Sequence, residues 1–199
     1  MKSMTLAALA LVAAIAAAPA TAQDRRPVYG SLYGGGSMFD VEFEFGGELG
    51  FEPEEDGDTL GVGLGYEIND NWFIQLDYTY TDASDVEIQQ GLLSLNYQRP
   101  LFIPGMRGFV GLVVGEGSLD WNDQPDFADA IRDDLDADED LIGLQLGLNY
   151  DLARHWSISL MYQVFDQEFN TNIETPDNGR LNFEHNGHQY LLFGLRFHL

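Results

Sequence analysis

The sequence contains no cysteine and one lysine, Lys2, among only 9 basic residues against 33 acidic ones. Without cysteine the chain has no disulfide framework, no thiolate metal site and no thiol nucleophile. The formal net charge of −24 repels phosphates, which argues against nucleic-acid binding. Beyond residue 22, no run approaches the roughly 18 apolar residues that a membrane-spanning helix needs, so a helical membrane protein is excluded.

Hydrophobic residues make up 45% of the chain and aromatic residues 13%, which is too much packing material for a disordered chain. The N-terminal segment 1–22 reads as a cleaved signal peptide. Lys2 precedes an apolar stretch at 6–18, and Ala20-Thr21-Ala22 forms a small-x-small cleavage site. We therefore expect export of one domain, residues 23–199.

From Leu60 onward the apolar residues alternate with a period of two, which predicts strands rather than helices. Residues 60–68 and 72–80 alternate around the turn Asn69-Asp70-Asn71. This is a hairpin of two strands of about ten residues, the length of a tilted membrane-spanning strand.

The same hairpin returns 84 residues later. Nine residues recur at that offset without a gap, from Leu60 and Leu144 at one end to Asp82 and Asp166 at the other. Leu95-Asn96-Tyr97 is a third, partial copy that also precedes a turn. Equal spacing of identical residues around each turn favours a closed, repetitive β-structure.

Eight strands are predicted, and short and long connections alternate between them. The strands are 28–39, 58–68, 72–82, 87–98, 107–118, 140–152, 156–168 and 187–199. The turns are 69–71, 99–106 and 153–155, the long connections are 40–57, 119–139 and 169–186, and a short connection spans 83–86. The expected fold is all-β, an eight-stranded antiparallel up-and-down transmembrane β-barrel with short periplasmic turns.

A soluble barrel such as a lipocalin would have its polar face outside, so the two faces must be assigned. The polar face carries many small and few charged residues, which suits a crowded lumen, whereas the acids gather in the long connections. Five aromatic residues lie next to the short turns, as in an interfacial girdle. They are Tyr66, Trp72, Tyr97, Tyr150 and Trp156. The phases of strands 28–39 and 107–118 stay open, because glycine and valine occupy both faces.

The last strand ends Gly194-Leu195-Arg196-Phe197-His198-Leu199. Its Gly194, Phe197 and Leu199 resemble the C-terminal signal that the barrel assembly machinery reads, although Leu199 stands where Phe or Trp is usual and Leu192 where a polar residue is usual.

The segment 65–82 (GYEINDNWFIQLDYTYTD), the signal peptide and the GLRFHL ending resemble the small eight-stranded outer-membrane barrels, the outer-membrane protein A-like and opacity-type family. The resemblance implies a barrel in the outer membrane of a Gram-negative bacterium. We expect a monomer in contact with lipid and lipopolysaccharide. It implies little chemistry, because the family is functionally mixed.

Four charged residues fall on the predicted lumen face: Glu67, Asp77, Asp151 and Arg196. An isolated charge is costly in a narrow interior, so pairing is expected. Glu67 and Asp151 lie at the depth of Arg196. A structural ion pair that plugs the barrel is the first interpretation, and a gate across a small cation-preferring pore is the alternative.

Acids crowd the connections 40–57 and 119–139, where residues 125–135 also show apolar residues at helical spacing. A solvated acidic face is the default, and loose binding of divalent cations that bridge to lipopolysaccharide is the alternative. An EF-hand is rejected, because Glu139 and Gln145 stand where the loop needs Gly and Glu.

Some barrels of this kind are lipid A-modifying enzymes, and His155-Trp156-Ser157 resembles their His-x-Ser pair. His155 lies in a short, periplasmic turn, whereas that catalysis faces the outer leaflet. Glu184, His185 and His188 cluster at the outer end of the last hairpin, where a polar loop end is the simpler interpretation than a metal site. No catalytic residue, metal or cofactor is therefore expected. The favoured role is structural or surface interaction, with a narrow diffusion channel second and a lipid A-modifying enzyme third.

Overall fold

The computed structural model describes residues 27–45, 48–49, 54–83, 86–121, 137–166, 169–174 and 180–199. Side chains are described for 27–39, 56–83, 86–120, 139–166 and 187–199. The expected signal peptide, 1–22, and the amphipathic segment, 125–135, lie outside the described residues, and both stay predictions. Among the described residues, no helix is long and apolar enough to cross a membrane.

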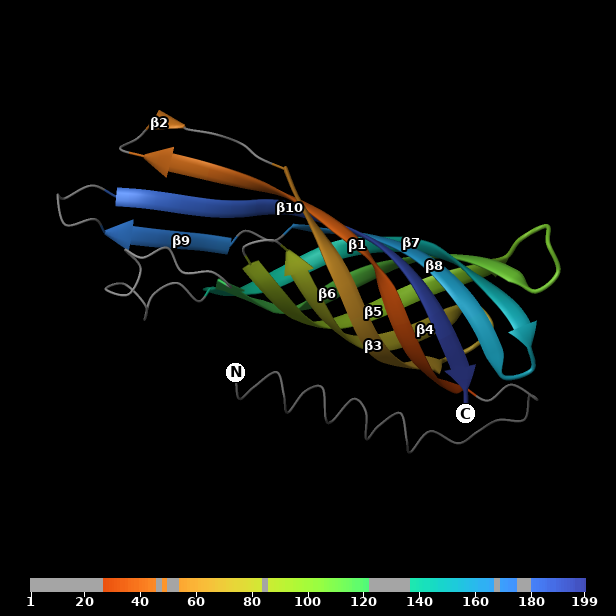
Figure 1. Ribbon diagram of the computed structural model, residues 1–199. Coiled ribbons are helices and arrows are strands. Elements are labelled where there is room, and N and C mark those ends of the chain that lie inside the picture. The colour runs from red at the N-terminus through yellow and green to blue at the C-terminus, as the bar shows by residue number, and fades with distance from the viewer. Residues whose placement is uncertain are drawn as a thin grey trace.

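The described chain is built from ten β-strands (Figure 1). They are β1 (Val28–Phe45), β2 (Glu48–Leu49), β3 (Glu54–Glu67), β4 (Trp72–Ala83), β5 (Val86–Pro100), β6 (Met106–Trp121), β7 (Ala137–Ala153), β8 (Trp156–Asp166), β9 (Phe169–Glu174) and β10 (Arg180–His198).

Eight of these strands form a closed barrel, because β1 pairs with both β3 and β10. Around the circle the order is β1-β3-β4-β5-β6-β7-β8-β10, and every neighbouring pair is antiparallel. The predicted eight-stranded antiparallel barrel is thus confirmed. The two short strands are additions, β2 beside β1 and β9 beside β10.

Several strands are longer than the alternation predicted, because charged segments expected in connections continue the ladders. β1 runs to Phe45, β3 begins at Glu54, and β10 begins at Arg180. The paired ends of β1 and β10, with β2 and β9 at their sides, extend as a flat sheet well beyond the rest of the barrel (Figure 1). The acids of these segments therefore belong largely to strand ends.

A β-bulge marks the point where this extension leaves the barrel. The register between β1 and β10 shifts between Met38 and Asp40, and Gly187 opposite them has a φ of 68°. This left-handed conformation favours glycine, as in the bulges that bend a strand and re-aim its side chains. Beyond the shift, the ladder pairs Phe43 with Phe183 and Glu42 with Glu184.

Burial alternates along the strands, most regularly in β4, where every second residue from Phe73 to Ala83 is buried. The outward positions form an exposed apolar band, the mark of a barrel that meets lipid. It includes Leu32, Leu60, Val62, Val110, Leu112, Leu144, Leu146, Leu160, Leu191, Phe193 and Leu195.

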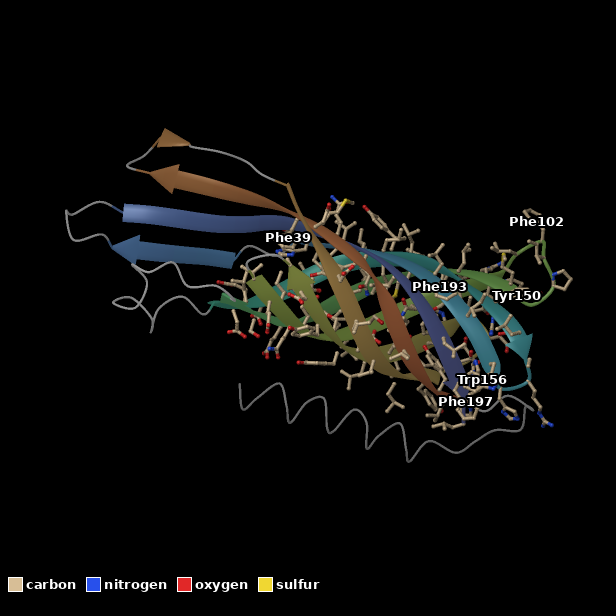
Figure 2. All side chains as sticks on the ribbon, viewed as in Figure 1. Phe39, Phe102, Tyr150, Trp156, Phe193 and Phe197 are labelled. Carbon is tan, nitrogen blue, oxygen red and sulfur yellow. The ribbon has the colours of Figure 1, made fainter. Side chains whose placement is uncertain are left out.

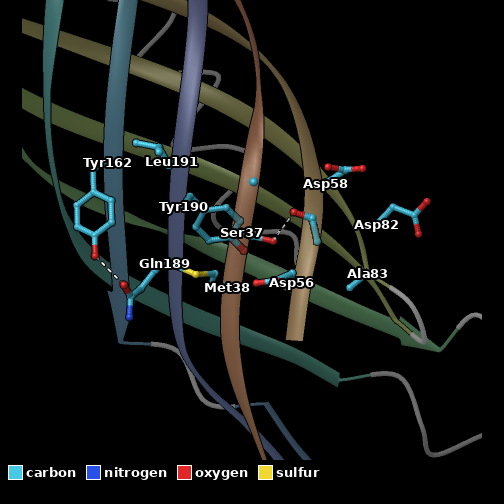
Figure 3. A pocket seen from close by; sticks show the side chains of 12 residues that line it. Ser37, Met38, Asp56, Asp58, Asp82, Ala83, Tyr162, Gln189, Tyr190 and Leu191 are labelled. Carbon is cyan, nitrogen blue, oxygen red and sulfur yellow. Dashed lines mark hydrogen bonds between the residues drawn. The ribbon is translucent and has the colours of Figure 1, made fainter. Parts of the chain in front are cut away.

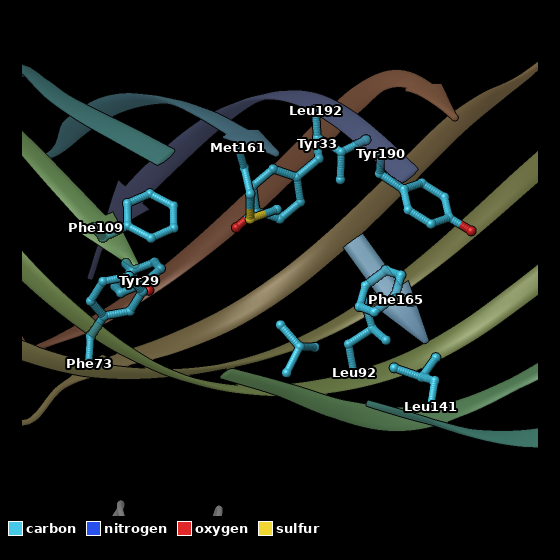
Figure 4. Close-up of a cluster of buried hydrophobic side chains, with 11 residues drawn as sticks. Tyr29, Tyr33, Phe73, Leu92, Phe109, Leu141, Met161, Phe165, Tyr190 and Leu192 are labelled. Atoms are coloured by element: carbon cyan, nitrogen blue, oxygen red, sulfur yellow. The ribbon is translucent and has the colours of Figure 1, made fainter. Parts of the chain in front are cut away.

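The inward face is more aromatic than the expected small polar lining. Six large rings are buried inside the barrel, and Figure 4 shows them beside aliphatic side chains. They are Tyr29, Tyr33, Phe73, Phe109, Phe165 and Tyr190. Buried polar residues line this face as expected, and the rings occupy the space among them. Period-two alternation identifies the inward face but not the size of its side chains, and an eight-stranded lumen is about as wide as its own side chains.

Several of the deep rings lie against a glycine on a neighbouring strand. A Cβ at Gly65 would overlap the Tyr29 ring, one at Gly194 would overlap the Tyr33 ring, and one at Gly147 would approach the Phe109 ring. The glycines along β3 and β7 are therefore the spaces into which the aromatic residues fit.

Replacing Gly65 by valine should destabilise the folded barrel by about 1–3 kcal/mol, the usual penalty for overpacking a filled interior. The matched control is Gly91→Val on the outward face of β5, because nothing lies within 4 Å of a Cβ there. Urea unfolding in micelles, followed by gel mobility, compares the two. Equal midpoints for Gly65→Val and Gly91→Val would contradict this packing argument.

Candidate functional site in the barrel lumen

Arg196 lies at the centre of a layer of side chains in the lumen, where it is buried. Its guanidinium carbon lies 4.8 Å from the centre of the Tyr29 ring, 5.2 Å from that of Phe73 and 5.7 Å from that of Phe109. Aromatic faces attract a cation, and the attraction grows when water is excluded. Three aromatic residues from β1, β4 and β6 thus hold one arginine from β10.

Gln75 joins this arginine to the rest of the layer. Its Oε1 accepts hydrogen bonds from Arg196 Nη2 at 3.1 Å and from the Tyr29 hydroxyl at 2.8 Å. Its Nε2 donates to the Tyr33 hydroxyl at 2.7 Å and to Asp77 Oδ2 at 2.7 Å. Asp77 is thereby linked to Arg196 through one neutral amide rather than by a direct ion pair.

A second layer lies nearer to the short turns and centres on Arg107. Its Nη2 donates to Asp151 Oδ1 at 2.8 Å, and its Nη1 lies 3.5 Å from Glu67 Oε1. The Ser157 hydroxyl donates to Asp151 at 3.0 Å and lies 3.1 Å from His198 Nε2. The acids are therefore ion-paired, as buried charges generally are.

This arrangement corrects the expected pairing. Glu67 and Asp151 were assigned to Arg196 as the one base on the lumen face, but Arg107 holds both of them. Arg107 was not assigned to the lumen, because glycine and valine occupy both faces of the predicted strand 107–118 and do not show which face points inward. The register supplies the missing signal, since Arg107 pairs with Asn149, a polar inward residue of the repeated hairpin.

Many of these contacts join strands that are not neighbours, so they cross the lumen. Arg196 to Gln75 joins β10 to β4, Arg107 to Glu67 joins β6 to β3, and Gln145 to Asn96 joins β7 to β5. A contact between non-neighbouring strands exists only where side chains from separate parts of the wall meet inside the barrel.

The half of the lumen farther from the short turns is mostly apolar. The rings of Phe165 and Tyr190 pack edge to face at 5.5 Å, beside Leu92, Leu141, Met161 and Leu192 (Figure 4). Where β1 and β10 leave the barrel, the His188 ring stacks on Phe39 at 5.2 Å.

The five aromatic residues assigned to a girdle lie on the outward face at the short-turn end. Trp72 and Trp156 are exposed, whereas Tyr66, Tyr97 and Tyr150 are half-buried. Trp72 packs against Tyr97 with ring centres 5.1 Å apart, and Trp156 packs against Phe197 at 4.8 Å (Figure 2).

The residues assigned to the C-terminal signal occupy both faces. Phe197 and Leu199 are exposed, and Gly194 faces the lumen beside Tyr33.

Four acids form one row across the outward face near the opposite end. Asp58 pairs with Asp82, Asp82 with Glu87, and Glu87 with Asp120, so the row crosses β3, β4, β5 and β6. Like charges directly opposite one another on a sheet are destabilising unless something neutralises them. We call these four residues the acidic row.

A hollow of about 700 Å³ lies beside the acidic row (Figure 3). Asp58 and Asp82 lie at one side of it and Tyr162 and Leu191 at the other, with Gly36 between them. The hollow therefore has an acidic side and an apolar side.

Ser157 and His155, the pair considered for catalysis, contact different atoms of His198. Ser157 is buried and bonded to Asp151 and His198, whereas His155 Nδ1 lies 3.3 Å from the backbone oxygen of His198. Glu184 and His185 belong to β10 rather than to a loop, and His188 is buried. Within the described residues, no three His, Cys, Asp or Glu side chains are grouped to hold a metal ion.

The comparisons with known proteins agree with this architecture. The model of the outer membrane protein beta-barrel domain family matches residues 7–188. No curated protein matches the chain.

Among solved structures, the outer membrane protein OprG from Pseudomonas aeruginosa is 17% identical with a TM-score of 0.59, covering 88% of this chain and 98% of its own. Neisserial surface protein A is 14% identical with a TM-score of 0.52, covering 84% and 97%. AlkL in lipid bilayers is 18% identical with a TM-score of 0.52, covering 92% and 96%.

The chain belongs to the outer membrane protein beta-barrel domain family, because the family model spans most of its length. In outer-membrane barrels the short turns lie at the periplasmic end and the long connections at the extracellular end. The solved structures are too distant in sequence to add more than the fold.

Replacing Arg107 by glutamine should destabilise the barrel by about 2 kcal/mol. The estimate is below the 3–5 kcal/mol typical of a fully buried pair, because Asp151 is 34% exposed and water screens it. The measurement is urea unfolding at neutral pH. Adding Glu67→Gln should recover part of the loss, since one unpaired carboxylate is then removed. If the double variant is no more stable than Arg107→Gln, Arg107 and Glu67 are not coupled.

Proposed function

We propose that this protein is a structural and surface-interaction component of the Gram-negative outer membrane whose lumen is closed to solutes. The observation that carries the proposal is the set of hydrogen bonds and ion pairs that join non-neighbouring strands through the lumen. Arg107 and Glu67 form one such contact, Arg196 and Gln75 another, and Gln145 and Asn96 a third.

Closure follows from the cost of breaking this network. A solute that passed Arg196 would have to displace a cation from three aromatic faces and from Gln75. A buried charge or polar group left without its partner costs several kcal/mol. The lumen therefore acts as a core that stiffens the barrel.

A narrow channel is the second candidate, and one observation favours it. The described lumen charges comprise three acids, Glu67, Asp77 and Asp151, but two bases, Arg107 and Arg196. An excess of acid would select for cations if water could pass.

The surface role rests on the acidic row and the hollow beside it. These features lie at the end of the barrel opposite the short turns, where we expect the phosphates of lipopolysaccharide. Divalent cations bind carboxylate and phosphate oxygens together, so they can bridge the row to an anionic lipid. The apolar side of the hollow, at Tyr162 and Leu191, would accept an acyl chain.

We further propose that the chain is not an enzyme. Ser157 is buried, and its hydroxyl hydrogen bonds to the carboxylate of Asp151. Although His198 Nε2 lies 3.1 Å away, the buried hydroxyl is not the accessible nucleophile that acyl transfer requires.

The lumen is tested by sugar and cation uptake into liposomes that carry the refolded protein. The wild-type barrel should show background uptake, whereas Phe109→Ala combined with Arg196→Ala should admit solutes. The matched control is Val110→Ala combined with Leu195→Ala, which alters the adjacent lipid-facing positions. Heat-modifiable gel mobility reports that each protein is folded. Uptake by the folded wild-type barrel would overturn the closed lumen and favour the channel.

The surface role is tested by neutralising the acidic row with Asp58→Asn, Asp82→Asn, Glu87→Gln and Asp120→Asn. In lipopolysaccharide micelles, magnesium should stabilise the wild type against heat but leave the variant unaffected. With EDTA the variant should be the more stable of the two, because each directly opposed like-charge pair costs about 0.2–1 kcal/mol. Asp70→Asn, in a periplasmic turn, is the control. Equal magnesium responses in wild type and variant would contradict the bridging role.

A further inference from the structure

A second hollow, of about 570 Å³, lies on the lipid-facing wall and begins near the periplasmic end. It crosses β5, β6, β7, β8 and β10 along two rows that the strand register defines. One row is Arg99, Gly108, Leu148 and Leu160. The other is Tyr97, Val110, Leu146, Tyr162 and Leu191.

The hollow exists because Gly108 has no side chain between Arg99 and Leu148. The Leu101 side chain borders this position, 3.5 Å from where a Cβ of Gly108 would lie. The surrounding positions carry long apolar side chains, so the missing one leaves a groove with apolar walls. We call it the Gly108 groove.

The groove rises from the membrane surface toward the middle of the bilayer. Tyr97 lies three residues from the periplasmic end of β5, whereas Leu191 lies seven residues from that of β10. The row from Tyr97 to Leu191 crosses four intervals between strands of about 4.8 Å each, about 19 Å in all. With the usual strand tilt, this path rises about 12 Å along the membrane normal. One leaflet holds about 15 Å of hydrocarbon, so the groove stays within it.

Arg99 lies at the low end of the groove, at the level of the aromatic girdle. Its Nε donates to the Tyr97 hydroxyl at 2.6 Å, and its guanidinium carbon lies 5.7 Å from the centre of that ring. This contact uses the Nε–H of the guanidinium rather than its two terminal nitrogens. A guanidinium matches the geometry of a phosphate, which it binds through two parallel hydrogen bonds.

We propose that the Gly108 groove binds one glycerophospholipid of the periplasmic leaflet. The lipid phosphate lies on Arg99, and one acyl chain crosses Gly108 and follows Leu146, Leu148 and Leu160 upward. Charge complementarity favours this occupant, since the groove has a cation at the depth of the phosphates and hydrocarbon above it. Lipopolysaccharide occupies the opposite leaflet. The proposal depends on the orientation of the barrel but not on whether its lumen is closed.

The test is native mass spectrometry of the refolded barrel in dodecyl maltoside, titrated with palmitoyl-oleoyl phosphatidylglycerol. The wild type should retain one lipid under conditions that strip the detergent. Arg99→Gln should weaken retention at least about tenfold, the effect of losing a charge-assisted hydrogen bond. Gly108→Leu should abolish it by filling the groove.

Two matched controls separate this site from general lipid association. Gly91→Leu adds the same side chain at an open outward glycine on β5, and Arg154→Gln removes an arginine from another periplasmic turn. Both should retain the lipid like the wild type. Equal retention by all four variants, or preferential retention of lipid A over the phospholipid, would overturn the proposal. Gel mobility identifies any variant that fails to fold. If Gly108→Leu does not fold, lipid retention by Arg99→Gln alone tests the proposal.

Discussion

A lumen only as wide as the side chains that enter it governs the packing of this protein. Eight strands enclose so little space that several deep rings lie against a glycine of a neighbouring strand, as Tyr29 does against Gly65. The same lack of space brings Arg196 against three aromatic faces and lets Gln75 reach four partners. The inward glycines, the buried rings and the buried charges thus all reflect the small width of the lumen.

The fold could be predicted from the sequence because its signals are local. Alternation of two residues, short turns and a hairpin repeated at 84 residues require only nearby positions, and they are sufficient to predict eight antiparallel strands. The ends of the strands were harder to predict, because acids were taken to mark loops. In β1 and β3 the charged residues instead continue the ladder, since they still pair with a neighbouring strand.

The lumen contacts required information that the sequence does not hold locally. Arg107 could not be placed, because alternating glycine and valine in residues 107–118 fit either face equally well. Gln75 is visible as a polar inward residue, but its contacts with Tyr29, Tyr33 and Arg196 depend on the closure of β1 on β10. The acidic row and the Gly108 groove likewise arise from the register of four or five strands.

The acidic row also makes the distribution of charge along the barrel axis uneven. Acids are concentrated at the extracellular end, whereas Arg99, Arg107, Arg154 and Arg196 all lie toward the periplasmic end. The barrel is therefore a permanent dipole along the membrane normal. Its negative pole attracts dissolved cations to the cell surface and repels anionic solutes before they reach the wall, with a range set by the ionic strength of the medium.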